Sequence, residues 1–243
     1  MAEPATDIPE TTPAEAEYLE VMFWLDEAGL PITAANIARA MRLSPPSVHE
    51  MITRLTAAGF ITRDADKIID FTEVGREHAT SMVYRHRLIE CFLTKVMGIS
   101  WEDVHEETER LEHSVSPALE ERMRAAVGDA TTCPHGHPFL PGEREQGSVL
   151  ADVEPGADIT VLRFENEAES ILHHLKNAGL EPQMTGKVVE QNEDTVVIED
   201  SDGGRHEIDR QAADTVTVRA NPAPPWRPPL PDLLVASDDR YGR

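Results

Sequence analysis

Histidine and glutamate side chains are concentrated in residues 84–113, which read YRHRLIECFLTKVMGISWEDVHEETERLEH. Residues four apart share one face of a helix, so His86 and Glu90 should point the same way. A second helix would present a further set on one face: His105, Glu109, Glu112 and His113. Imidazole nitrogens and carboxylate oxygens are typical ligands of divalent metal ions. Charged residues on a helix also form ordinary solvated faces, and this alternative stays open from the stretch alone.

Two helices joined at Gly98 can fold back as a hairpin and bring these side chains together. Another helix begins far upstream, where Thr12 and Glu15 form a capping box around a proline. That helix carries Glu17 and Glu20, three residues apart. Acids in a first turn also favour the helix dipole, so they need no other purpose.

The composition is that of a globular protein with a strongly acidic surface. Its 243 residues include 22 Lys and Arg against 45 Asp and Glu, giving a net charge of −23. This balance argues against indiscriminate nucleic-acid coating and favours cation binding or a solubilising surface. No apolar run approaches the roughly 20 residues of a membrane span, and the first residues lack a secretory signal. We therefore expect a cytoplasmic protein with no membrane partner and with reduced cysteines.

Residues 33–71 are typical of a winged helix-turn-helix. A short helix from Thr33 to Met41 precedes a tight turn, a second helix capped by Ser44, and two β-branched segments around a polar tip. Between residues 33 and 63 the charged residues are four arginines and one glutamate, so this part is basic. The residues expected to contact DNA are Arg39, Arg42, Ser44, Pro45, Pro46, Ser47, His49, Glu50 and Arg54. A winged helix that binds protein is the alternative.

A long helix predicted after residue 72 carries more apolar surface than one buried stripe requires, which indicates a homodimer interface. A third helix opens at Ser116. The turn-rich segment that follows, TTCPHGHPFLPG, contains Cys133, His135 and His137. Their spacing is cramped and the prolines are many, so we expect no tetrahedral zinc site there.

The periodicity changes beyond residue 148. Segments 158–164, 185–190, 195–199 and 215–219 alternate or are β-branched, and one helix, Glu169 to Asn177, interrupts them. We expect a small β-barrel, followed by an extended and largely disordered Pro-rich tail.

The order of these parts resembles the diphtheria toxin repressor family of metal-dependent transcriptional repressors. The most specific shared pieces are TPAEAEYLE, SPPSV, YRHRLIE, VHEETERLEH and CPHGHPF. The resemblance implies a mainly α protein with a small all-β domain. Its parts would be a disordered arm (1–11), a winged helix-turn-helix DNA-binding domain (12–73), a helical metal-binding and dimerisation domain (74–140), a linker (141–147), an SH3-like domain of the ferrous-transport-A type (148–219) and a disordered Pro-rich tail (220–243).

The resemblance also implies a set of metal ligands: His86, Glu90, His105, Glu109, Glu112 and His113, with Glu17 and possibly Glu20 from the first helix. An ion between Glu17 and Glu109 would fix the DNA-reading domain against the dimer domain. Because the ion binds that arrangement better, it would act as an allosteric switch. Glu167, in the β domain, is a further candidate ligand, although solvated loop acids are commoner.

Ligand type favours Mn²⁺ over Fe²⁺. The iron-responsive branch of the family has Met and Cys where Glu17 and Glu109 stand, whereas the manganese-responsive branch has carboxylates at both places. Hard oxygen donors suit Mn²⁺. We expect Mn²⁺, with Fe²⁺ as the alternative, and two ions per subunit. Glu50 departs from the family pattern, since an acid on the recognition face cannot help phosphate binding but could accept from cytosine or reject other sequences.

These observations favour a repressor of metal-ion homeostasis that binds a palindromic double-stranded operator as a homodimer. No enzyme activity and no small organic substrate are expected. A dinuclear metal-dependent hydrolase is a contrasting possibility, because similar ligands build two-metal catalytic sites, but the sequence presents no spare nucleophile or general base. A metal-independent winged-helix regulator with only surface charges in the hairpin is the third possibility.

Overall fold

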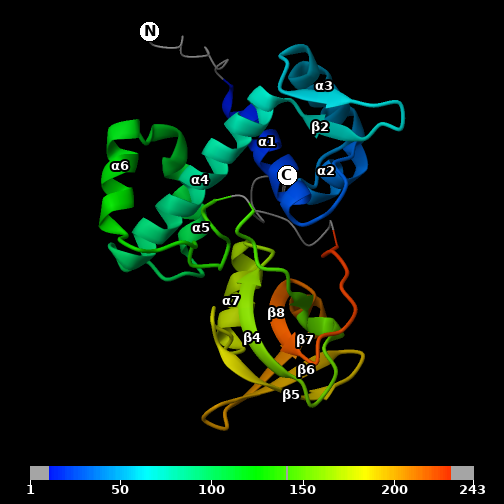
Figure 1. The fold of residues 1–243 in the computed structure, drawn as a ribbon, viewed down its shortest axis with the longest axis vertical. Coiled ribbons are helices and arrows are strands. Elements are labelled where there is room, and N and C mark those ends of the chain that lie inside the picture. The colour runs from blue at the N-terminus through cyan, green and yellow to red at the C-terminus, as the bar shows by residue number, and fades with distance from the viewer. Residues whose placement is uncertain (1–10, 141, 231–243) are drawn as a thin grey trace.

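The structure is a computed structural model of the chain and describes residues 11–140 and 142–230. The helices of residues 13–126 gather at one end of the molecule, and the β domain, which contains two further α-helices, lies at the other (Figure 1). The predicted arm before Thr11 and the predicted tail from residue 231 onward lie outside the described residues. Within the two described ranges, no helix combines the length and apolar character needed to cross a membrane.

The first part of the chain is the expected winged helix-turn-helix. Its elements are α1 (Pro13–Glu27), α2 (Ala34–Ala40), α3 (Pro45–Ala57), β1 (Ile61–Arg63) and β2 (Ile69–Phe71). The capping box at the start of α1 is present, because the Thr12 hydroxyl accepts from the Glu15 amide and the Glu15 carboxylate accepts from the Thr12 amide. Strands β1 and β2 pair antiparallel as the wing. Leu19, Met22 and Leu25 are fully buried and anchor the helices to one core.

The long helix α4 belongs to two hydrophobic cores. The helical elements of the middle region are α4 (Glu73–Lys95), α5 (Val104–Leu111), the 3-10 helix η1 (Glu112–Ser114) and α6 (Pro117–Ala126). Ala79 and Val83 of α4 pack with the DNA-binding helices, whereas Leu88 and Ile89 pack with α5 and α6. At its start, Gly75 lies so close to the wing that an added Cβ would stand 1.8 Å from the Phe60 carbonyl oxygen. Helix α4 therefore connects the two helical regions directly.

The last part of the chain is an antiparallel β domain. Its elements are β3 (Ser148–Val149), the 3-10 helix η2 (Leu150–Asp152), β4 (Asp158–Phe164), α7 (Glu169–Asn177), β5 (Thr185–Gln191), β6 (Thr195–Asp200), β7 (Arg205–Asp209), α8 (Arg210–Ala213) and β8 (Val216–Asn221). The six strands are ordered β3-β8-β4-β5-β6-β7. Within residues 148–221 no ladder joins β3 to β7, so the barrel that we expected is a sheet without closure. The predicted bounds of α7 are confirmed.

Two segments attach the β domain to the helices. Trp101 precedes α5 in the chain, yet its ring packs in the β-domain core, 5.0 Å from the Phe164 ring centroid. After β8 the chain continues to residue 230 without helix or strand, and Arg227 forms ion pairs with Asp152 and Asp214. Beside it, the Trp226 ring lies against Gly29 at the end of α1. We expected this Pro-rich segment to be extended and largely disordered; its described part, up to residue 230, has no helix or strand but is held by these contacts and returns to the DNA-binding region.

Candidate metal centre

Most of the predicted ligands converge in a buried space between α1, α4, α5 and the segment that follows β4. Within the described residues, three buried groups have possible ligand atoms that all lie within 4.8 Å of one another. One group is His86, Glu90, His105 and Glu167; a second is Glu90, Cys133, His135 and Glu167; a third is Glu20, His86 and Glu112. The groups share members, so they form one continuous centre.

The carboxylate of Glu90 is the middle of this centre. Its Oε1 atom lies 3.2 Å from His86 Nε2, 3.2 Å from His105 Nδ1 and 3.3 Å from His135 Nδ1. The i, i+4 spacing of α4 places His86 beside Glu90, as predicted, and the return of the chain through α5 supplies His105. Three imidazoles around one carboxylate form a donor set suited to a transition-metal ion.

Glu167 brings a carboxylate from the β domain into the same space. It lies between β4 and α7, and its side chain is turned inward with 13% exposure. Its Oε2 is 2.9 Å from His105 Nδ1 and its Oε1 is 3.4 Å from His135 Nδ1. The backbone of the preceding turn is fixed by Asn166, whose side chain accepts from the Ala168 amide. The structure therefore does not place Glu167 among the solvated loop acids.

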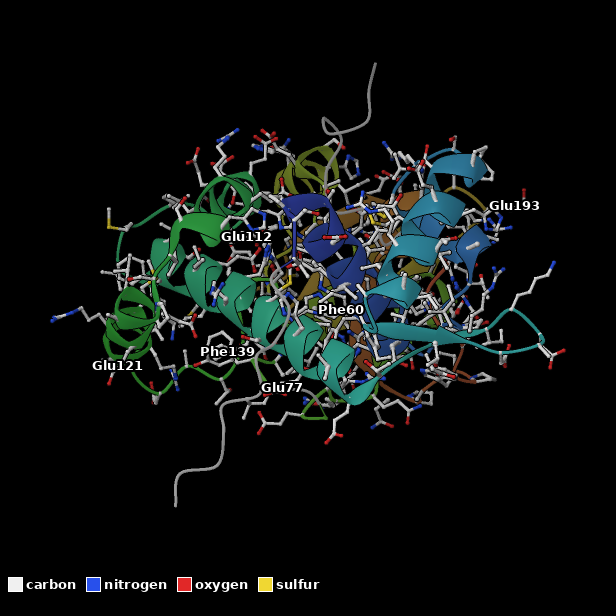
Figure 2. All side chains as sticks on the ribbon, turned by 90° about the horizontal axis from the view of Figure 1, so that it is seen from above. Phe60, Glu77, Glu112, Glu121, Phe139 and Glu193 are labelled. Carbon is white, nitrogen blue, oxygen red and sulfur yellow. The ribbon has the colours of Figure 1, made fainter. Side chains whose placement is uncertain are left out.

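A second end of the centre faces the DNA-binding helices. His86 Nδ1 is 2.9 Å from Glu112 Oε2 and 3.5 Å from Glu20 Oε1. Figure 2 shows Glu112 on the green segment between α5 and α6, near the dark blue α1. Since Glu20 belongs to α1 and His86 to α4, this triad joins the DNA-binding region to the middle helical region, with Glu20 in place of the Glu17 that we had expected to make the link.

The remaining predicted ligands lie at the edge of this centre. Glu109 Oε1 is 3.2 Å from His105 Nε2. His113 has a 45% exposed side chain, and its Nε2 is 3.6 Å from Glu112 Oε1. Glu17 is half-buried on α1 and belongs to none of the three buried groups. Glu20, which we had included only as a possible ligand, is the α1 carboxylate that belongs to a buried group, and the pairing of Glu17 with Glu109 stays a prediction.

Cys133 and His135 are the site residues that the sequence reasoning missed. We expected no zinc site there, because a site made only by residues 133, 135 and 137 would be cramped. Cys133 and His135 instead join Glu90 and Glu167, which come from distant elements. His135 Nε2 donates to the Trp101 carbonyl oxygen at 2.7 Å. A carbonyl only accepts, so in the neutral ring Nδ1 carries the lone pair and faces Glu90. The neighbouring His137 Nε2 donates to the Phe164 carbonyl instead.

Charge and burial act against each other throughout the centre. Burial lowers the pKa of His86, but the carboxylates of Glu90 and Glu20 outweigh it and raise that pKa well above its usual value. Burial likewise opposes the ionised form of Glu90, yet His135 and His86 hold the pKa of Glu90 well below normal. Burial raises the pKa of the Cys133 thiol to about 12. Without a cation, the carboxylates are therefore balanced by histidine charge.

Several polar atoms of the centre fit a bound cation. In the described ranges, Glu90 Oε2, His105 Nε2 and His135 Nδ1 are buried and make no hydrogen bond of good geometry. A buried polar group without a hydrogen bond destabilises the folded protein, and a bound cation would remove this cost. Three such oxygen and nitrogen atoms, of the types that bind divalent ions, support a metal here.

Around the centre, buried ion pairs tie the three regions together. The Glu27 carboxylate of α1 accepts from both terminal nitrogens of Arg87 on α4, at 3.0 and 2.6 Å. Arg144 of the linker bridges Glu27 at 3.2 Å and Glu165 at 2.6 Å. Arg163 of β4 also contacts Glu165. A rotation of α1 away from the β domain would have to break this network.

The predicted DNA-contacting residues lie on the opposite side of the helix-turn-helix. All of these predicted residues have exposed side chains: Arg39, Arg42, Ser44, Pro45, Pro46, Ser47, His49, Glu50 and Arg54. Ser44 caps α3, and Val48, Ile52 and Leu55 bury the inner face of that helix. Figure 1 shows α3 and the wing at the end of the molecule farthest from the β domain.

Comparisons with known proteins agree with this layout. Residues 10–67 match the family described as "Iron dependent repressor, N-terminal DNA binding domain", and residues 72–141 match "Iron dependent repressor, metal binding and dimerisation domain". The iron-dependent repressor IdeR of Mycobacterium tuberculosis is 36% identical over 141 residues, which are 58% of this chain and 60% of that protein. The matched segment thus spans about 60% of the length of such curated relatives.

Solved structures extend the likeness over the β domain. A "Manganese-dependent transcriptional repressor complex with manganese" is 27% identical, with a TM-score of 0.74 over 85% of this chain and 99% of that one. The crystal structure of T. acidophilum IdeR is 26% identical, with a TM-score of 0.68 over 87% of this chain and 99% of that one. The relatives therefore include proteins described by iron and by manganese.

Proposed function

Since this chain belongs to the iron-dependent repressor family, we propose that it is a homodimeric, metal-dependent repressor of metal-ion homeostasis genes. It binds a palindromic operator when the centre is loaded with metal. The two α3 helices of a dimer would enter successive major grooves. The exposed, locally basic face of the helix-turn-helix supports this role in a chain that is otherwise acidic.

One observation carries the proposal. Glu20 comes from the DNA-binding region, His86 and Glu90 from the helix shared by both helical cores, and Glu167 from the β domain, yet all four meet in one buried centre. An ion that binds the carboxylate of Glu20 together with the ligands of α4 favours the arrangement in which α1 is held against α4. Differential binding of this kind shifts the population toward the DNA-competent state.

The donor set supports two ions per subunit and Mn²⁺ as the resident ion. Glu90, His105, His135 and Glu167 would hold one ion, and Glu20, His86 and Glu112 a second. Carboxylates make up half or more of each set, and hard oxygen donors suit Mn²⁺. Fe²⁺ is the alternative. Cys133 is the softest donor within reach, and its use would favour a softer ion.

The test is metal-dependent retention of DNA by the full chain. Wild-type protein with Mn²⁺ should retain a duplex selected from a random library, and a chelator should release it. Glu20→Gln keeps the shape of the side chain but removes the charge that α1 supplies, so activation should require at least about tenfold more Mn²⁺. Glu121→Gln, an exposed change on α6, is the matched control.

The outcomes separate the alternatives. DNA retention that is insensitive to chelator and to Glu20→Gln would identify a metal-independent regulator and reject the proposal. Activation by Mn²⁺ and by Fe²⁺ should also be compared in anaerobic buffer. Activation by Fe²⁺ alone would reject the assignment of Mn²⁺ but keep the metal switch.

A further inference from the structure

Glu50 is the acidic side chain on the outer face of α3, and its surroundings leave it without a partner. It is exposed, and no hydrogen bond or ion pair joins it to the part of the chain that the structure describes. On a helix its natural ion-pair partner is the basic residue four positions later, Arg54. Arg54 is instead drawn to α1, where its Nη2 lies 2.9 Å from Glu15 Oε1.

The other neighbours of Glu50 on the same face are also engaged. The Ser47 hydroxyl is 2.9 Å from the Ser44 hydroxyl at the start of the helix. The Thr53 hydroxyl donates to the His49 carbonyl oxygen at 2.9 Å. Glu15 itself is held by the capping box at Thr12, so the contact that diverts Arg54 is anchored in the fold. Glu50 therefore projects from the second turn of α3 as an acceptor that the protein does not use.

When the DNA-reading face enters the major groove, an exposed carboxylate loses hydrating water and requires a donor from the DNA, which phosphates cannot supply. In the major groove, the base edge suited to a carboxylate is the N4 amino group of cytosine. Adenine also has an amino group there, but its N7 acceptor lies beside it and would repel the carboxylate. Side chains near the start of a recognition helix are those that reach base edges. Glu50 is the sixth residue of α3, within this part.

We propose that Glu50 is a specificity-determining residue that accepts a hydrogen bond from a cytosine in each operator half-site. The inference rests on the proposed function and adds the chemistry of the base that is read. The contact gives selectivity at the cost of general affinity, because a carboxylate near the DNA backbone is repelled at every other sequence. Glu50→Gln replaces the acceptor with an amide, which pairs with adenine N6 and N7.

The experiment is selection from a random duplex library by full-length protein with Mn²⁺, followed by affinities for duplexes that differ at one base pair. Wild type should prefer cytosine at one symmetric position of each half-site by roughly 5- to 100-fold, the discrimination of one good base contact. Glu50→Gln should shift that preference to adenine, and Glu50→Ala should remove it. Glu193→Gln, an equal charge change in the exposed β5–β6 turn, should leave the preference unchanged.

Two results would overturn the inference alone. One is an identical base preference in wild type and both Glu50 variants. The other is an equal gain in affinity for every sequence, which would place Glu50 opposite phosphates. Wild-type protein that retains no DNA with Mn²⁺ would overturn the proposed function as well. Because that failure appears in the wild type, it is distinct from the first two. Unchanged thermal unfolding of the variants verifies their folding.

Discussion

The His135 side chain is oriented by contacts that need no metal. Its Nε2 donates to the Trp101 carbonyl, and the adjacent Gly136 lies so close to β4 that an added Cβ would stand 2.0 Å from the Leu162 carbonyl oxygen. The loop is therefore pressed onto the sheet with Nδ1 of His135 aimed at Glu90. A ligand held in advance binds with less loss of conformational freedom.

We predict that His135→Ala weakens Mn²⁺ binding by at least about tenfold, because it removes a pre-oriented nitrogen donor. Titration calorimetry of metal-free protein measures this directly. His174→Ala is the control, since His174 is exposed on α7 and pairs with Asp209 away from the centre. Equal Mn²⁺ affinity in His135→Ala and wild type would remove His135 from the ligand set.

Sequence spacing predicted the part of the centre that is local. His86 and Glu90 share a helix face, and His105 follows on the next helix, so helical periodicity together with the turn at Gly98 predicts that they meet. His135 could not be found in this way, because its partners Glu90 and Glu167 lie far away in the chain. The tautomer that would suit His135 to metal binding depends on a backbone carbonyl, and no residue type in the sequence indicates that contact.

At the scale of elements, the position of α4 depends on the absence of a side chain at Gly75. We predict that Gly75→Ala destabilises the protein by about 2 kcal/mol or more, because its Cβ would meet the Phe60 backbone. For a chain of this size, the melting temperature should fall by on the order of 5 °C. Ser81→Ala, an exposed change on the same helix, should leave it almost unchanged. A melting temperature for Gly75→Ala equal to that of wild type would contradict the close approach.

Element types were largely predictable, and their contacts were not. Capping residues marked the starts of α1, α3 and α6, and their side chains do cap these helices. The placement of Trp101 in the β-domain core has no comparable signal, because an aromatic residue before a helix is equally suited to several cores. The strand patterns also could not predict that the sheet of residues 148–221 stays open, because they do not specify which edge strands pair.

At the scale of the whole molecule, Glu27 joins α1, α4 and the linker through Arg87 and Arg144. Burial opposes ionisation of Glu27, but Arg87 outweighs it and lowers the pKa of this carboxylate below its usual value. A lowered folded-state pKa means that the ion pair stabilises the protein above the ordinary glutamate pKa. That contribution is lost as the pH falls through the lowered pKa.

We therefore predict that Glu27→Gln costs about 3 kcal/mol at pH 7, because it leaves buried guanidinium charge unpaired. The difference from wild type should shrink below about pH 4, where Glu27 of the unfolded wild-type chain takes up a proton, and should vanish below the lowered pKa of the folded state. Urea unfolding of metal-free protein at both pH values measures the two differences. Glu121→Gln should show no such convergence. A difference that stays constant with pH would contradict the role of Glu27.

The shared position of Glu167 has a consequence for biosynthesis. The ribosome releases α1 to α6 before Glu167 is made, so the nascent helical part has Glu20, His86 and Glu112 but lacks the carboxylate that the β domain supplies. A product truncated before β4 would keep a DNA-reading surface with an incomplete centre. The centre can therefore be completed only after translation has passed residue 167.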